Sequence, residues 1–323
     1  MPVDLYVGGV EHAVLHLLYA RFWHKVLFDL GHVSGNEPFR RLVNQGLILG
    51  ETEYWTTATP PRRVSEEEVA KSASGGLVVK SDPSVRVTAE SFKMSKSRGN
   101  VVSPDAIVED YGADTFRLYE MYLGPLEAQK PWNTRDIVGM SRFLSSVWRN
   151  LVGQDESEKG SAAVDEPVPE ALDRLMHRTI KKVGGDIEGL RFNTAIAELI
   201  KLNNELVGQK SVPRELAENF TLMLAPFAPH IAEEIWERLG HHKSLTRRPW
   251  PTFDPAKLTE STIELAVQVN GKLRGTITVA INSDEQQVLL AAAAAEKVVP
   301  WLAGKTILKK LYVPKRLVNF VVS

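Results

Sequence analysis

The chain has 323 residues, of which 43% are hydrophobic and 24% are charged, and it contains no cysteine. This length predicts two or three domains, and the composition is that of an ordinary soluble protein without disulfides or thiolate metal sites. No segment has the length of a membrane span and no signal-peptide pattern is present, so we expect a cytoplasmic protein. The net charge of −1 excludes nucleic-acid binding only if the charge is evenly spread.

The first predicted elements are a strand and a helix joined by two glycines. Residues 3–7 form a β-prone run closed by Gly8 and Gly9, and apolar residues then recur at helical spacing over residues 11–25. Strand, glycine turn and helix are the elements of a doubly wound sheet, whose ligands lie beyond the carboxyl ends of its strands. Residues 39–49 predict the next helix and strand of the same sheet.

Two histidines lie on the first predicted helix. His12 and His16 are one helical turn apart, beside Glu11, which raises the possibility of a zinc site. The order of these residues is not the metalloprotease pattern and no third ligand is obvious nearby, so we expect no metal. A packed pair of helical histidines is the structural alternative.

Helical and strand periodicity both fail between residues 56 and 88. Prolines, an acidic run and paired glycines interrupt this stretch, with short strands predicted at residues 77–79 and 85–87. We interpret it as a surface insertion and assign it no chemistry.

A basic loop follows at residues 92–100. Lys93, Lys96 and Arg98 alternate there with small hydroxyl residues, and a Gly-Asn pair then allows a sharp turn. Lysine suits a polyphosphate that must be gripped and released, because it is a point charge on a flexible stem. The structural alternative is a solvated basic turn. Downstream, Arg117 has two possible roles, a phosphate contact or a salt bridge with a neighbouring Asp.

Five apolar stripes at helical spacing predict an up-and-down bundle over residues 132–252, with an exposed connector at residues 153–169. Asn133 or Thr134 is expected to cap the first helix and Asn193 the third. The fourth and fifth helices are predicted to open at prolines, namely Pro213 and Pro229.

The last predicted unit, residues 260–323, is small and mixed. Residues 263–269 alternate at period two, Asn270 and Gly271 are a strong hairpin signal, and an Ala-rich helix over residues 285–299 precedes two more strands. Residues 263–323 carry eight Lys and Arg against four Asp and Glu, a local excess suited to a phosphate backbone. The unit lacks the aromatic platform of single-strand readers, so shape and backbone recognition fit better. A basic solubilising face is the alternative.

Several of these motifs resemble those of a known family. Residues 93–97, Lys-Met-Ser-Lys-Ser, are the signature of class I aminoacyl-tRNA synthetases, and residues 111–119 follow at the family's spacing. Residues 124–127 and 130–132 are similar to the leucyl branch, and residues 224–234 match the helical domain shared by class I enzymes for aliphatic amino acids. The resemblance runs along nearly the whole chain and indicates the C-terminal part of a bacterial leucyl enzyme.

This resemblance implies a multidomain fold. Residues 1–131 are expected to form the C-terminal half of a partial α/β, Rossmann-like catalytic domain, residues 132–252 an anticodon-binding-type α-helical bundle, and residues 260–323 a small α+β tRNA-binding domain.

The resemblance also implies site residues. Lys93 and Lys96 are expected to be catalytic by stabilising the departing pyrophosphate, and His12 and His16 to line the amino-acid pocket. The expected ATP-binding residues are Gly8, Gly9, Glu11, Met94, Ser95, Lys96 and Ser97, although plain packing is equally expected of Met94. The expected tRNA-binding residues are Lys272, Arg274, Lys309, Lys310, Lys315 and Arg316.

The implied function is a leucine–tRNA ligase component that uses ATP and Mg²⁺ to activate leucine and transfers it to tRNA(Leu). The family's first half-sheet and editing domain have no counterpart here, so activity is expected only with the missing N-terminal part. Two explanations are open: a natural two-subunit enzyme whose other chain brings those parts, or a gene fragment cut from a single-chain enzyme. That part is expected to cover apolar surface around Leu5, Val7 and Leu47. The alternative is a non-catalytic tRNA-binding protein derived from a synthetase.

Overall fold

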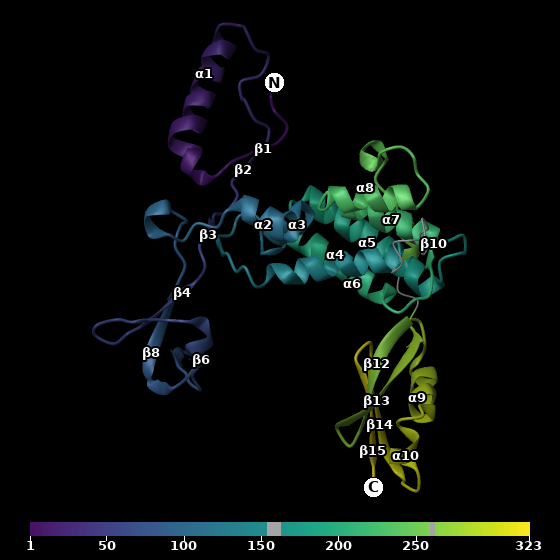
Figure 1. Cartoon of the computed structure of the whole chain (residues 1–323). Helices are drawn as coiled ribbons and strands as arrows, with labels where there is room; N and C mark the ends of the chain where they lie inside the picture. Colours follow the sequence, from purple (N-terminus) through teal and green to yellow (C-terminus); the bar gives the residue numbers. More distant parts are fainter. Residues whose placement is uncertain (154–162, 259–261) are drawn as a thin grey trace. The chain divides into compact units, whose positions relative to one another are not determined.

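The computed structural model describes residues 1–153, 163–258 and 262–323, which form two compact units, Met1–Thr252 and Phe253–Ser323 (Figure 1). Helices and several separate sheets make up the described residues, so the prediction of a multidomain fold with both element types is confirmed. Residues 154–162 of the predicted connector and residues 260–261 of the predicted last unit lie outside the described residues.

The N-terminal segment contains one strand pair and one helix. Strand β1 (Tyr6–Val7) pairs in parallel with β2 (Leu42–Val43). Between them a 3-10 turn (Val10–His12) and a π-helical turn (Ala13–Leu17) precede α1 (Leu18–Asp29). The helix predicted within residues 39–43 is therefore wrong, because pairing with β1 holds these apolar residues in an extended conformation.

Strand β3 (Ile48–Leu49) does not join that sheet. It pairs in parallel with β9 (Lys130–Pro131), and Leu49 forms a single bridge with Lys93. The prediction of one continuous sheet through residues 3–7 and 47–49 is thus wrong for the described chain. Close backbone approach favours the observed pairing, because a Cβ on Gly46 would lie 2.0 Å from the carbonyl oxygen of Ala128. The basic loop and the segment ending at β9 therefore meet at β3.

The predicted insertion is a five-stranded antiparallel sheet in the order β5-β4-β8-β7-β6. Its buried centre is made by Val64, Val79 and Val87. The strands are β4 (Glu53–Thr56), β5 (Arg63–Val64), β6 (Val69–Lys71), β7 (Leu77–Val79) and β8 (Asp82–Glu90). The two predicted short strands lie within β7 and β8, and the sheet extends further than predicted because β8 has nine residues and pairs on both sides.

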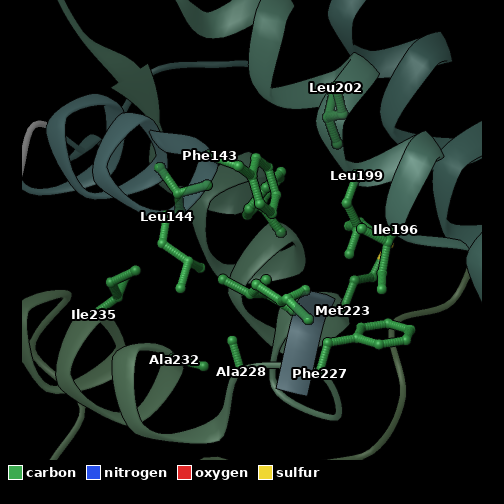
Figure 2. Packing of buried hydrophobic residues seen from close by; sticks show 14 of the residues in the cluster. Phe143, Leu144, Ile196, Leu199, Leu202, Met223, Phe227, Ala228, Ala232 and Ile235 are labelled. Atoms are coloured by element: carbon green, nitrogen blue, oxygen red, sulfur yellow. The ribbon is translucent and has the colours of Figure 1, made fainter. Parts of the chain in front are cut away.

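Seven helices of the described first unit share one hydrophobic cluster, seen in close-up in Figure 2. They are α2 (Pro104–Tyr111), α3 (Ala113–Tyr122), α4 (Ile137–Leu151), α5 (Glu170–Glu188), α6 (Phe192–Leu206), α7 (Arg214–Leu224) and α8 (Pro229–Arg238). Figure 2 shows Phe143 and Leu144 of α4 pointing into the space that Leu199 of α6 and Met223 of α7 also fill. The short strands β10 (Ala163–Val164) and β11 (Val212–Pro213) pair in parallel beside these helices. Helices α4 to α8 lie where the five apolar stripes predicted helices, and α2 and α3, which precede residue 132, pack into the same cluster.

The predicted caps are only partly correct. Pro229 begins α8 and Pro213 directly precedes α7, as expected. Helix α4, however, begins after Asp136, because the side chains of Asn133 and Thr134 bond to other groups. Helix α6 begins at Phe192, so Asn193 is inside it and does not cap it.

A buried carboxylate organises the turn between α5 and α6. Asp186 is 1% exposed and accepts hydrogen bonds from Lys182, from Nε of Arg191 at 2.9 Å and from Oγ1 of Thr194 at 2.6 Å. Burial alone would raise the pKa of Asp186, but these hydrogen bonds and the adjacent lysine outweigh it and lower the pKa. The ionised carboxylate therefore joins the end of α5 to the start of α6.

The described residues of the second unit contain a four-stranded sheet, two α-helices and a short 3-10 helix (Pro255–Leu258). Its elements are β12 (Thr262–Val269), β13 (Lys272–Ala280), α9 (Glu285–Ala294), α10 (Val299–Leu302), β14 (Ile307–Val313) and β15 (Leu317–Val322), with strand order β13-β12-β15-β14. The predicted hairpin at Asn270 and Gly271 is confirmed, with φ of 51° and 76° as a tight β12–β13 turn requires. The predicted Ala-rich helix ends early, at Ala294, and restarts as α10.

Candidate active site

The basic loop is anchored at both ends. The amide of Gly50 donates to the carbonyl of Phe92 at 2.8 Å, which ties the loop to β3. The Oδ1 atom of Asn100 accepts from the amide of Ser95 at 2.9 Å, and its Nδ2 atom donates to the carbonyl of Lys93 at 3.4 Å. A Cβ on Gly50 would lie 2.6 Å from that Nδ2, so a larger residue at position 50 would displace the Asn100 amide. The loop is thus closed by its own asparagine.

The anchored loop exposes two lysines. Lys93 and Lys96 are exposed, and neither forms an ion pair with any residue that the structure describes. Arg98 differs, because its guanidinium lies 3.6 Å from the centroid of the Phe92 ring and 3.6 Å from Oε2 of Glu53. The loop therefore presents two ammonium groups to solvent while its arginine is held against the protein.

The remaining predicted loop residues lie between these cations. The hydroxyl oxygens of Ser95 and Ser97 are 3.4 Å apart. Met94 is half-buried and packs against the helical cluster, which is the packing role weighed for it from sequence. The serines thus border the lysines, and the methionine ties the loop to the helices.

The glycine turn after β1 supports a carboxylate. The amide of Gly8 donates to the carbonyl of Val43 at 3.1 Å. The exposed side chain of Glu11 folds back over Gly9, where an added Cβ would lie 2.2 Å from Oε2 of Glu11. The absence of a side chain at Gly9 therefore allows the Glu11 carboxylate to lie against the turn.

His12 and His16 are both exposed and lie close to each other. Their rings meet edge to face with centroids 6.5 Å apart, and Nε2 of His16 hydrogen-bonds to the hydroxyl of Tyr6. The Tyr6 ring in turn stacks on Phe39. No group of three or more His, Cys, Asp or Glu side chains that could hold a metal ion occurs within residues 1–153, 163–258 and 262–323.

An interhelical clamp was missed from sequence. Asp114 on α3 is 8% exposed and accepts from the amide of Ile231 at 2.7 Å and from the amide and Nδ1 of His230 at 3.3 and 2.9 Å, at the start of α8. Arg117 donates to the carbonyl oxygens of Pro226 and Phe227 at 2.9 and 3.2 Å. The salt bridge considered for Arg117 is wrong, because that side chain holds the α7–α8 turn instead. No local signal reveals partners that lie 116 residues apart.

The segment leading into α4 is held by aromatic side chains. Trp132 is 3% exposed and donates from Nε1 to the hydroxyl of Thr134 at 2.9 Å, and that hydroxyl donates to Glu51 at 2.9 Å. The hydroxyl of Tyr119 donates to the carbonyl of Asn133 at 2.7 Å, and burial raises the pKa of Tyr119 to about 12. These contacts join α3, β3 and the start of α4.

The six expected tRNA-binding residues lie in three places on the second unit. Lys272 and Arg274 belong to β13 at one edge of the sheet, and Lys309 and Lys310 to β14 at the other. Lys315 and Arg316 form the turn between β14 and β15. Five of these side chains are exposed, whereas Arg274 is half-buried and stacks on Trp301.

Within the described residues, no helix is both long and apolar enough to cross a membrane.

Two protein-family models match the chain. The model described as "tRNA synthetases class I (I, L, M and V)" matches residues 84–130, which contain the anchored basic loop, α2 and α3. The model described as "Anticodon-binding domain of tRNA ligase" matches residues 170–290. The helical architecture and the loop that carries Lys93 and Lys96 thus define a protein of the class I tRNA synthetases.

Similarity to individual proteins narrows this class. The chain is 46% identical to a leucine–tRNA ligase of Rhodopirellula baltica, over all of this chain and 37% of that protein, and 50% identical to one of Chlorobium chlorochromatii, over all of this chain and 35% of that protein. A crystal structure of the Agrobacterium radiobacter K84 agnB2 LeuRS–tRNA–LeuAMS ternary complex matches with a TM-score of 0.62 at 31% identity, covering all of this chain and 38% of that one. The chain belongs to the leucine–tRNA ligase family and corresponds to its C-terminal part. It spans little more than a third of the length of these relatives.

Proposed function

We propose that this chain is a leucine–tRNA ligase component that, in the cytoplasm, activates leucine with ATP to leucyl-adenylate and transfers it to tRNA(Leu). The observation that carries this proposal is the anchored loop, which holds Lys93 and Lys96 exposed and without carboxylate partners among the described residues. Two such ammonium groups on one turn suit the charge of a nucleotide polyphosphate.

The lysines would act on the leaving group. In the activation step a leucine carboxylate oxygen bonds to the α-phosphorus of ATP, and the bond from that phosphorus to the bridging oxygen of the β-phosphate breaks. Negative charge develops on the departing pyrophosphate, and Lys93 and Lys96 neutralise it. No general base is needed, because a carboxylate is already a nucleophile. Mg²⁺ supplies further neutralisation of the pyrophosphate when bound.

The glycine turn and the histidines fit the other parts of the substrates. The Glu11 carboxylate, which lies over Gly9, would accept hydrogen bonds from the adenosine ribose, with Gly8, Met94, Ser95 and Ser97 completing the nucleotide site. His12 and His16 are exposed one helical turn apart and would line the leucine pocket. The parallel β1–β2 pair with its glycine turn supports a partial Rossmann-like domain over residues 1–131, followed by the helical bundle at 132–252 and the α+β domain at 260–323.

An N-terminal part from another chain would complete the active site. Large apolar side chains are exposed along the first thirty residues, including Leu5, Val7, Val14, Leu15, Leu18, Phe22 and Trp23, whereas Leu47 is half-buried. Such a surface is too extensive for an isolated soluble unit and suits a protein partner.

The test is reconstitution with the N-terminal part of a homologous ligase supplied as a separate polypeptide. Lys96→Ala should lower leucine-dependent ATP–pyrophosphate exchange by about 10²-fold, the usual cost of removing one group that stabilises transition-state charge. Lys71→Ala, which removes an exposed lysine of β6, is the matched control and should leave exchange unchanged. Exchange at the wild-type rate after both Lys93→Ala and Lys96→Ala would refute the catalytic role.

The second candidate is a non-catalytic tRNA-binding protein. It is favoured by the basic second unit, Phe253–Ser323, which is compact by itself. In that case the wild-type chain binds tRNA(Leu), and no reconstituted mixture catalyses leucine-dependent exchange.

A further inference from the structure

Arg274 occupies an irregular position in the second unit. The pairing of β12 with β13 shifts so that Val267 lies opposite Gly275 and Gln268 lies opposite Leu273, which leaves Arg274 with no residue opposite it. Such a β-bulge redirects the side chain of the extra residue. Arg274 is therefore directed differently from the regularly paired residues of β13.

The redirected side chain meets an aromatic ring. The Cζ atom of Arg274 lies 3.3 Å from the centroid of the Trp301 ring on α10. The chain before α10 reaches this position because Gly275 has no side chain, and a Cβ there would lie 3.2 Å from Cγ2 of Val298. The bulge and the glycine together bring the guanidinium and the indole into contact.

The stacked guanidinium has no counter-charge among the residues that the structure describes. No carboxylate there forms an ion pair with Arg274, and its Nε is buried without a hydrogen-bond partner. Exposed Lys272 is two residues from Arg274 in sequence, and the Cβ of exposed Lys297 would lie 3.4 Å from a Cβ on the adjacent Gly275. Glu296 is the acidic residue next to Lys297 in sequence. Trp301 remains 40% exposed, so the stack is at the surface.

We infer that Trp301 is a positioning residue that holds the Arg274 guanidinium for a two-point contact with a backbone phosphate of tRNA. A planar guanidinium matches phosphate oxygens with two parallel hydrogen bonds, and stacking on an indole fixes its plane before binding. Because Nε is shielded, the terminal nitrogens would make the contact. The inference rests on the proposed binding of tRNA(Leu), and it adds a residue to those expected from the basic charge alone.

The experiment measures binding of the full chain to a fluorescently labelled tRNA(Leu) transcript by anisotropy at several KCl concentrations. Arg274→Lys keeps the charge but loses the fork, and Trp301→Leu removes the ring, so each should weaken binding about fivefold. Trp301→Phe should bind like the wild type. Arg274→Ala should reduce the slope of log affinity against log salt by about 1, whereas Arg274→Lys should not.

The double variant separates positioning from independent contact. If Trp301 acts through Arg274, Arg274→Ala with Trp301→Leu should bind no more weakly than Arg274→Ala alone. Lys71→Ala, a cation removed from the first unit, is the control and should change affinity less than twofold. Circular dichroism and thermal unfolding establish that each variant is folded.

The outcomes distinguish two failures. Absence of tRNA binding by the wild-type chain would overturn the proposed tRNA interaction itself. Suppose instead that the wild-type chain binds tRNA(Leu). If Trp301→Leu then leaves the affinity unchanged, or if the affinity losses of the two substitutions add in the double variant, the positioning role is overturned and the proposed function stands.

Discussion

The clamp between α3 and α8 gives the sharpest test of the fold. Asp114→Asn keeps the size of the side chain but removes its charge and turns one of its acceptors into a donor. The carboxylate accepts three hydrogen bonds at the start of α8, two of them from backbone amides. Losing one charge-assisted hydrogen bond costs about 2 kcal/mol, and losing the negative charge at a partly buried helix N-terminus costs about 1 kcal/mol more.

The expected loss of about 3 kcal/mol corresponds to about a 10²-fold change in the local opening equilibrium, since 1.36 kcal/mol is a factor of ten. Native-state hydrogen exchange measures it: the amides of α8 should exchange about 10²-fold faster in Asp114→Asn, whereas those of α9 in the second unit should not change. Asp105→Asn is the matched control, because Asp105 is in the first turn of α2 but exposed. Asp105→Asn should lower the stability of its helix by only about 0.5 kcal/mol. Unchanged exchange in α8, or equal effects of the two substitutions, would refute the clamp.

Two further predictions concern stability. Burial alone would raise the pKa of Asp186, but hydrogen bonds from three side chains outweigh burial and lower it. The contribution of the ionised Asp186 to the free energy of unfolding is therefore complete above the unfolded-state pKa of about 4, and it is lost as the pH falls through the lower folded-state pKa. Asp186→Asn should therefore flatten the loss of urea resistance as the pH falls below about 4, and an unchanged acid profile would contradict this. Gly46→Ala should lower the free energy of unfolding by several kcal/mol, because the added Cβ would lie 2.0 Å from the Ala128 carbonyl oxygen. Gly139→Ala in α4, where the added Cβ has nothing within 4 Å, should raise that free energy by up to about 1 kcal/mol. Thermal unfolding that shifts in the same direction for both variants would show this reasoning to be wrong.

The sequence by itself determined the features that depend on neighbouring residues. The hairpin at Asn270 and Gly271 was predictable because tight turns require positive φ, and few residues adopt it easily. The helix starts near Pro213 and Pro229 were predictable because proline suits the first turn of a helix. The basic loop at residues 92–100 was likewise recognisable from its own residues.

Tertiary structure decided the features that depend on which segments meet. Residues 42–43 became a strand because β1 lies beside them, and β3 paired with β9 although the two are about eighty residues apart. Asp114 holds the start of α8, and Arg274 stacks on Trp301. The residues around Asp114 and around Arg274 carry no periodic pattern that predicts either contact. Pairing across the chain depends on packing and close backbone approach, which local propensity does not encode.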